Sequence, residues 1–143
     1  MGRLLAGWRA LSWRERTRLI ACGAGVTLVH VALALFGYGR TRRMVEMVTH
    51  RADTRPATAA DISNARALAK LANVAGRHGV VDASCLRQSL LLYGWLQWRG
   101  LRPVLQLGVK EDPGQLSAHA WVELEGTRLL SIDSGFRSFF SSR

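Results

Sequence analysis

Residues 117–124 read Ser-Ala-His-Ala-Trp-Val-Glu-Leu, and their alternation decides the fold class. Small and aliphatic side chains take every second position from Ala118, while His119, Trp121 and Glu123 take the positions between them. Successive side chains of a β-strand point to opposite faces, so this period of two predicts a strand with one apolar face. We expect the strand to hold His119 in a fixed position.

Two further strands are predicted on either side of this segment. Residues 103–109 favour a strand that begins with a proline, and residues 110–115 form a polar turn that contains Pro113-Gly114. After Glu125-Gly126, residues 127–133 are predicted to return as the second strand of a hairpin. The sequence therefore predicts a small antiparallel sheet.

Two helices are predicted before the sheet. The first covers about residues 59–76, with Thr58 as its cap and Asp61 where a capping box has glutamate, and it ends near Gly76 and Gly79. The second begins at about Cys85, with Asp82 or Ser84 as its cap, and Gly100 ends it. Its dense apolar pattern predicts burial on most sides. Helices followed by antiparallel strands indicate an α+β fold.

The N-terminal part of the chain is predicted to be helical and basic. Ser12-Trp13-Arg14-Glu15 fits a capping box, and residues 19–37 are uncharged over a length close to that of a membrane span. Arginines flank both ends, so the positive-inside rule predicts no orientation. Two interpretations stay open: a helix that inserts into or lies on a membrane, and a helix buried against the rest of the protein or a partner.

Length and charge suggest how the chain is divided. The 143 residues, of which 48% are hydrophobic, suffice for one compact core and exclude a disordered chain. The net charge is +10, and residues 1–55 hold a surplus of seven positive charges. A basic helical region at residues 1–57 is therefore expected before a core at residues 58–143, with a joint at Thr54-Arg55-Pro56. Charge alone selects no partner.

The two cysteines differ in their surroundings. Cys22 lies among Ala, Gly and Val and is expected to be a small buried hydrophobe. Neither cysteine has the spaced Cys/His partners of a zinc site, and no glycine-rich phosphate loop is present in the sequence. We therefore expect no metal and no cofactor.

Cys85 is the candidate nucleophile. A cysteine attacks as the thiolate, and a helix N-terminus together with an imidazolium partner lowers the pKa of a thiol. His119 is the candidate partner, and Asp133 on the return strand is the candidate carboxylate that orients it. The alternative, in which these residues only pack, stays open.

The length of the loop around Gly126 tests the pairing of His119 with Asp133. A loop of three residues, 125–127, sets His119 opposite Asp133, whereas a loop of two residues places Asp133 on the other face. Because Gly126 permits a bulged turn, an odd loop length is predicted.

These segments resemble a known family. The pattern is similar to the transglutaminase-like cysteine protease of lasso peptide biosynthesis, the leader peptidase of the maturation pair, over about residues 58–133. The similar segments are Cys85-Leu86, Ser89-Leu90, Leu107-Gly108-Val109-Lys110 and Ala118-His119-Ala120-Trp121-Val122-Glu123. The resemblance implies a papain/transglutaminase-like core, in which the helix that carries Cys85 packs on a small antiparallel sheet, after an N-terminal helical region.

The resemblance also implies an activity and partners. Cys85, His119 and Asp133 would form the triad that cleaves the leader from a lasso peptide precursor. A separate leader-binding protein would deliver the precursor, and an ATP-dependent cyclase would close the product. We expect a cytoplasmic protein that binds no nucleic acid, with membrane association through residues 13–37 left open. Two rival functions are acyl transfer to an amine by the same triad and a noncatalytic membrane-associated scaffold.

Overall fold

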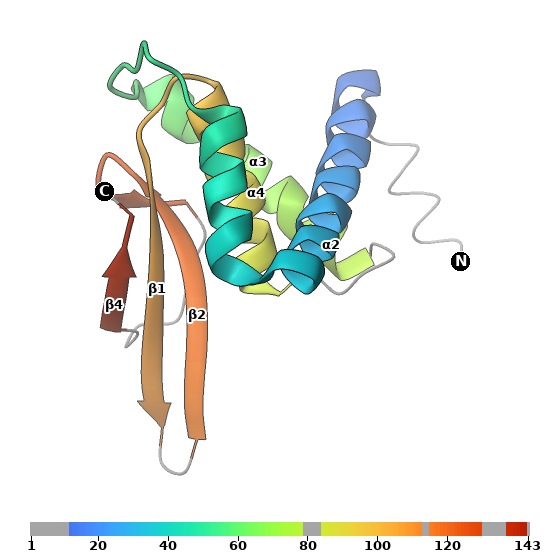
Figure 1. The fold of residues 1–143 in the computed structure, drawn as a ribbon. Coiled ribbons are helices and arrows are strands. Elements are labelled where there is room, and N and C mark those ends of the chain that lie inside the picture. Colours follow the sequence, from blue (N-terminus) through green and yellow to red (C-terminus); the bar gives the residue numbers. More distant parts are fainter. Residues whose placement is uncertain (1–11, 79–83, 113–114, 130–136, 143) are drawn as a thin grey trace.

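The computed structural model describes residues 12–78, 84–112, 115–129 and 137–142 as an α+β fold, which confirms the predicted class. Figure 1 shows the elements in chain order. Their bounds are α2 Trp13–Thr49, α3 Ala59–His78, α4 Cys85–Trp98, β1 Pro103–Asp112, β2 Gln115–Leu124, β3 Thr127–Arg128 and β4 Arg137–Ser141.

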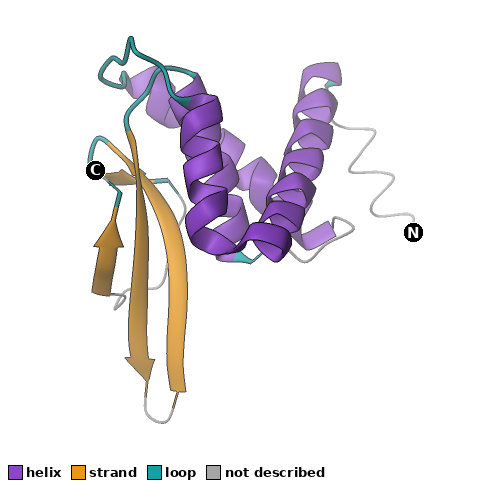
Figure 2. Ribbon diagram, in the orientation of Figure 1, coloured by secondary structure: helices purple, strands orange, loops and turns teal. Residues whose placement is uncertain are grey.

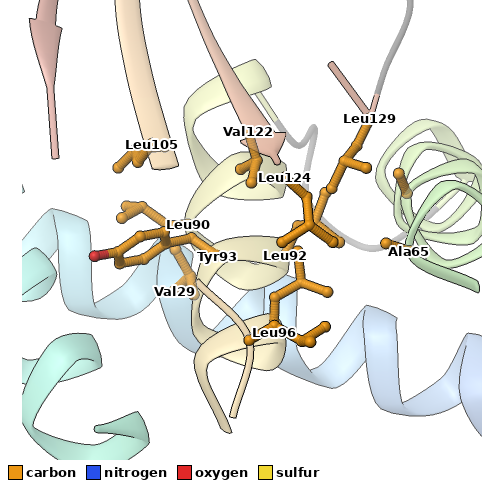
Figure 3. Packing of buried hydrophobic residues seen from close by; sticks show 12 residues of the cluster. Val29, Ala65, Leu90, Leu92, Tyr93, Leu96, Leu105, Val122, Leu124 and Leu129 are labelled. Carbon is orange, nitrogen blue, oxygen red and sulfur yellow. The ribbon is translucent and has the colours of Figure 1, made fainter. Parts of the chain in front are cut away.

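The described strands form one antiparallel sheet in the order β3-β2-β1-β4. Figure 2 shows the helices gathered on one side of this sheet. In the core, α4 lies between the sheet and the other helices (Figure 3). Buried apolar side chains from all of these elements meet there, among them Val29, Ala65, Leu90, Leu92, Tyr93, Leu96, Leu105, Val122 and Leu124.

Helix α2 begins at the predicted capping box and bends sharply at Gly37. The Ser12 N–H donates to Glu15 Oε2 over 2.8 Å, and the Glu15 N–H donates to Ser12 Oγ over 3.3 Å. Gly37 has φ +72°, a left-handed conformation that glycine adopts without a steric penalty. The bend divides α2 into a first arm, residues 13–36, and a second arm, residues 38–49.

Both arms pack on α4. A Cβ at Gly25 would lie 2.5 Å from Leu91 Cδ1, and a Cβ at Gly94 would lie 2.8 Å from Val45 Cγ1, so glycine permits close approach at each arm. Of the two interpretations of this apolar stretch, burial against the rest of the protein holds only for part of it. By length and composition α2 is the one described helix able to cross a membrane, yet only 17% of its most apolar window is buried.

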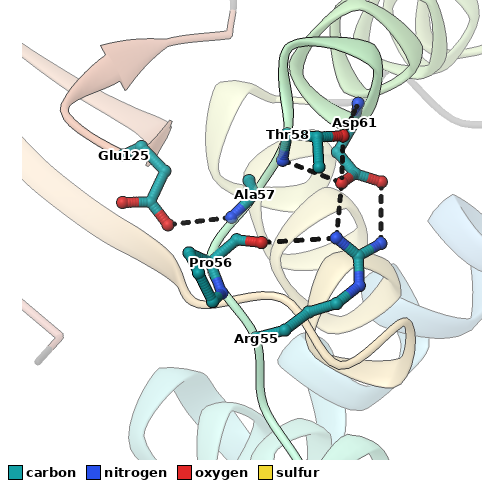
Figure 4. Close-up of polar contacts among 6 residues, drawn as sticks. All are labelled: Arg55, Pro56, Ala57, Thr58, Asp61 and Glu125. Atoms are coloured by element: carbon teal, nitrogen blue, oxygen red, sulfur yellow. Dashed lines mark hydrogen bonds and ion pairs between the residues drawn. The ribbon is translucent and has the colours of Figure 1, made fainter.

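Hydrogen bonds among Arg55, Thr58 and Asp61 stabilise the start of α3 (Figure 4). Asp61 Oδ2 accepts the Thr58 N–H over 2.9 Å, and Thr58 Oγ1 accepts the Asp61 N–H over 3.2 Å. This confirms the predicted cap with aspartate in place of glutamate. The Arg55 guanidinium binds both Asp61 carboxylate oxygens, at 2.6 and 3.0 Å. With Thr58, it holds the pKa of the Asp61 carboxyl well below its usual range.

The hairpin of β1 and β2 is longer than predicted. Residues 110–112 and 115 belong to the strands and are not part of a polar turn, since Lys110 pairs with Ser117 and Asp112 with Gln115. Continued backbone pairing satisfies the polar groups of these residues in the sheet, so their polar side chains do not end the strands. Residues 113–114, where the turn was predicted, lie outside the described part of the chain.

The loop between β2 and β3 corrects a second prediction. It has two residues, Glu125 and Gly126, because Leu124 pairs with Thr127 and Glu123 with Arg128. The predicted three-residue loop is therefore wrong. Both loop residues have positive φ, +48° and +72°, the geometry of a two-residue turn that matches the twist of the strands. Glu125 is held in this conformation through its carboxylate, which accepts the Ala57 N–H over 3.0 Å.

Only the first residues of the predicted return strand, 127–129, are described. The β3 strand ends at Arg128, and one further hydrogen bond, from the Leu129 N–H to the Val122 carbonyl over 3.1 Å, extends the pairing. The next described strand, β4, pairs with β1 and not with β2. The register argument that placed His119 opposite Asp133 therefore does not hold, and Asp133 lies outside the described residues.

The charge pair at the start of α3 predicts an acid-sensitive contribution to stability. The pKa of Asp61 is lower in the folded chain than its unfolded value of about 3.9. The charged carboxylate therefore stabilises the fold above that value, and this contribution disappears as the pH falls through the folded-state pKa. We expect Asp61→Asn to lower the urea midpoint at neutral pH and to flatten its decline in acid.

The exposed carboxyl of Asp53 in the preceding loop provides the matched control. Asp53→Asn should leave the dependence of the urea midpoint on pH as it is in the unsubstituted chain. Equal acid dependence in Asp61→Asn and the unsubstituted chain would contradict the role assigned to the Arg55–Asp61 pair.

Candidate functional site

Cys85 is the first residue of α4, as predicted. Its N-cap is Ser84, whose side chain makes no capping hydrogen bond, and no acidic residue occupies the first turn. Asp82, the other candidate cap, lies outside the described residues. The first N–H groups of a helix carry a fractional positive charge, and here no carboxylate within the first turn offsets it. Cys85 therefore lies at the positive end of the α4 helix dipole.

Only one of the two free cysteines is accessible. The Cys85 side chain is half-buried, whereas Cys22 has 0% exposure, and its burial raises the pKa of the Cys22 thiol. The prediction that Cys22 is a buried hydrophobe is confirmed. Cys85 is the described thiol that a substrate can reach.

His119 lies in the middle of β2, half-buried, and pairs with Gly108 of β1. By the alternation of the strand, its side chain shares a face with Trp121 and Glu123. The side chains on the other face, including Val122 and Leu124, are in the core beside α4. The predicted division of the two strand faces is confirmed in this part of β2.

A buried hydrogen bond joins the helix of Cys85 to the strand of His119. The Ser89 hydroxyl donates to the Ala120 carbonyl over 3.0 Å, and Ser89 is completely buried. Ser89 follows Cys85 by one helical turn and lies on the same helix face. Ala120 is the neighbour of His119. The bond therefore brings the second turn of α4 to the residue next to His119 on β2.

The Ala120 carbonyl points away from β1, so the hydrogen bond from Ser89 places α4 at the outer edge of β2. The Val122 carbonyl points to β3, since it accepts the Leu129 N–H. Carbonyls two residues apart in a strand point to the same side, so the Ala120 carbonyl points to the same edge of β2. Ser89 thus satisfies this carbonyl at the edge of the sheet, beyond the described residues of β3. At an edge, a helix can approach side chains of either face of the strand.

Trp121 fills the sheet face next to His119. Its indole N–H donates to Glu123 Oε1 over 2.9 Å, and the Arg128 guanidinium lies 5.0 Å from the ring centroid. A Cβ at Gly108 would lie 2.7 Å from the Trp121 ring and 2.8 Å from the Arg137 carbonyl oxygen. Glycine opposite His119 therefore leaves the space that the indole occupies.

The sequence analysis named two further residues, Ser89 and Gly108, as part of the resemblance and assigned neither a role in the site. The signal of Ser89 was its place one turn after the cysteine. Gly108 carried a usable signal, because a glycine inside a strand often marks a close approach by another group. Both residues position the elements of the site and carry no reactive group.

Of the three predicted triad residues, the structure describes Cys85 and His119 but not Asp133. Cys85 lies on α4 and His119 on β2, and the hydrogen bond from Ser89 to Ala120 joins these two elements. A direct contact between the thiol and the imidazole stays a prediction, as does the role of Asp133, which lies outside the described residues. Among the described residues, no group of three His, Cys, Asp or Glu side chains could hold a metal ion.

Comparison with known proteins links the chain to one family. A family model described as transglutaminase-like superfamily matches residues 25–139. The match begins in the first arm of α2 and continues through α3, α4 and the sheet into β4. Neither the curated proteins nor the solved structures gave a match. The division of the chain at residue 57 stays a prediction.

The hydrogen bond between α4 and β2 predicts the effect of removing one hydroxyl group. In Ser89→Ala the buried Ala120 carbonyl loses its donor, and an unsatisfied buried polar group costs about 1–3 kcal/mol. We expect the free energy of unfolding, measured in urea, to fall by that amount. The control is Ser63→Ala on the exposed face of α3, which should change it little. Equal stability of the two variants would show that this hydrogen bond does not hold the helix to the strand.

Proposed function

The chain belongs to the transglutaminase-like superfamily, and on this premise we propose that it is a cysteine peptidase with Cys85 as its nucleophile. The observation that carries the proposal is the position of Cys85, half-buried at the start of α4, with the next turn hydrogen-bonded beside His119. Members of this superfamily often carry out acyl transfer through a cysteine. The accessible thiol and the neighbouring imidazole fit that chemistry.

The proposed reaction has two steps. The Cys85 thiolate attacks the scissile carbonyl, with the N–H of Cys85 as a donor to the oxyanion, and the leaving amine takes a proton from His119. A thioester remains on Cys85. Water then gives a proton to His119 and attacks the thioester, which releases the acid and restores the thiolate. Asp133 is proposed to orient the imidazole.

The proposed substrate is the precursor of a lasso peptide, cleaved between leader and core. The support is the similarity of the Cys85-Leu86 and His119-Ala-Trp-Val-Glu segments to the leader peptidases of that pathway. A separate leader-binding protein would deliver the precursor, and an ATP-dependent cyclase would use the freed amine of the core. We place the reaction in the cytoplasm.

A second candidate function is acyl transfer to an amine, which the family match favours. The first step would be the same, and an amine in place of water would attack the thioester on Cys85. The two functions use the same proposed triad and differ only in the product. Mass spectrometry of the product therefore distinguishes a free acid from an amide.

The nucleophile assignment is tested with Cys85→Ala. Incubated with a lasso precursor and its leader-binding protein, the unsubstituted chain should release leader and core, measured by mass spectrometry. Removal of the thiol should lower the cleavage rate by roughly a thousandfold or more. The matched control is Cys22→Ala, which removes the buried thiol and should leave cleavage unchanged. Substantial cleavage by Cys85→Ala would rule out this nucleophile.

The role of Asp133 has a separate test. Asp133→Asn should lower the cleavage rate by about 10²–10⁴-fold while the far-UV circular dichroism stays that of the unsubstituted chain, because the amide no longer orients the imidazole. Asp53→Asn, in an exposed loop, is the control with the same chemical change. An unchanged rate in Asp133→Asn would mean that another group orients His119.

A further inference from the structure

The two arms of α2 enclose an apolar groove that the proposed chemistry does not use. The arms diverge from Gly37, as Figure 1 shows, and α4 forms the floor between them. The groove has a volume of about 400 Å³. Its walls include Leu28 and Ala32 of the first arm and Met44 and Val48 of the second, and Trp98 lines it from α4.

The side chains at the rim of the groove are large, apolar and exposed. Leu28 is 71% exposed and Val48 is 80% exposed, and Leu35 and Met47 beside them are exposed to a similar degree. Exposed apolar surface that continues over two helices marks an interaction site, because water disfavours it. The rim and the groove together are called the apolar face below.

The packing of the first arm argues against a membrane span. Val26 and Val29 of this arm are buried within the protein, and Gly25 lies against Leu91 of α4. A first arm that crossed the bilayer would lose these contacts. The second arm is held separately, because the Thr49 hydroxyl donates to Gln97 Oε1 of α4 over 2.9 Å and Glu46 accepts from the Tyr93 hydroxyl over 3.3 Å. With these contacts intact, α2 lies along the surface of the protein.

The charges near the apolar face are mainly positive. Residues 16–48 contain five arginines and one acidic residue, Glu46. Arg42 is paired with Glu46, whereas Arg40 and Arg43, on either side of it, are exposed. Arg51 lies 5.5 Å from the ring centroid of Trp98 at the rim. Exposed arginines and tryptophan beside apolar side chains are typical of a membrane interface.

The lining of the groove favours hydrocarbon over a protein partner. Apart from the indole N–H groups of Trp95 and Trp98, its polar side chains are those of Thr41 and Thr49. Thr41 is buried, and the Thr49 hydroxyl already bonds the Val45 carbonyl and Gln97. Protein interfaces carry about one hydrogen bond per 100–200 Å², and this lining offers few groups to form them. Lipid chains require none.

We propose that the apolar face binds an anionic phospholipid bilayer as an interfacial surface. Leu28, Leu35, Met47 and Val48 enter the boundary of the acyl chains, and Arg40 and Arg43 contact the phosphate groups. The helical core stays packed, so the protein lies on one side of the membrane. Vesicle binding requires neither substrate nor Cys85, and its failure would therefore leave the proposed peptidase activity untouched.

Flotation with vesicles tests this surface. The full chain, purified in mild detergent, is diluted into preformed vesicles of phosphatidylcholine alone or mixed with phosphatidylglycerol. We expect it to float with both and more strongly with the anionic vesicles. Absence of flotation would overturn the proposal. So would a dimer in light scattering that Leu28→Asp/Val48→Asp abolishes, because the apolar face would then bind a second copy.

Pairs of variants and matched controls test which part of the protein contacts the membrane. Leu28→Asp/Val48→Asp should lower the partition coefficient at least tenfold, about 1.4 kcal/mol, whereas Val74→Asp/Phe139→Asp makes the same change at exposed apolar positions outside the groove and should have little effect. Arg40→Ser/Arg43→Ser should lower binding to anionic vesicles roughly thirtyfold, about 2 kcal/mol, because two positive charges leave the membrane surface. Arg66→Ser/Arg137→Ser is its control. Equal losses in a variant and its control would overturn the proposal.

Trypsin added outside the vesicles distinguishes a protein that lies on the membrane surface from one whose first arm spans the bilayer. A protein that lies on the outer surface exposes Arg14 and Arg18 as well as Arg40 and Arg43 to the protease. We therefore expect the residues before the first arm to be cleaved off in intact vesicles. A protected fragment that retains Arg14 would show a spanning helix and would overturn the proposal.

Discussion

The hydrogen bond from the Ser89 hydroxyl to the Ala120 carbonyl is the constraint on which the site depends. It is buried, and it satisfies a carbonyl at the edge of β2 that the described part of β3 does not reach. At that edge Ser89, one turn after Cys85, contacts Ala120, the neighbour of His119. Apolar packing also holds α4 near the sheet, but such packing has little directional preference, whereas this bond fixes one point of contact.

The rest of the fold holds α4 in place. Helix α4 is buried on most sides, between the sheet and the arms of α2, and the close contacts at Gly25 and Gly94 let both arms approach it. The turn after β2 is fixed to the start of α3 through Glu125 and Ala57, so the end of β2 and the helices share one framework. Cys85 and His119 are thus carried by elements whose positions several contacts determine together. A cysteine nucleophile needs such positioning because its partner must lie within hydrogen-bonding distance during proton transfer.

Local sequence signals predicted the elements but not all of their extents. The capping residues Ser12 and Thr58 determine helix starts by hydrogen bonds within four residues, and the alternation from Ala118 determines a strand face, so both were predictable. The loop at Glu125 was not, because its length depends on a contact with Ala57, which is distant in the sequence. The extension of β1 to Asp112 depends likewise on pairing with β2. Of the site, the place of Cys85 at a helix start was predictable, whereas the link through Ser89 depends on tertiary structure.

A bifunctional alkylating reagent tests most directly whether the thiol of Cys85 and the imidazole of His119 face one another. In Cys22→Ala protein, the Cys85 sulfur would form a C–S bond with 1,3-dibromoacetone and displace one bromide ion, and a neighbouring nucleophile would displace the other bromide from the second carbon. Peptide mass spectrometry after proteolysis should then find the peptide that contains Cys85 joined to the peptide that contains His119. Cys85 alkylated without a bridge to His119, or bridged to another residue, would contradict the account.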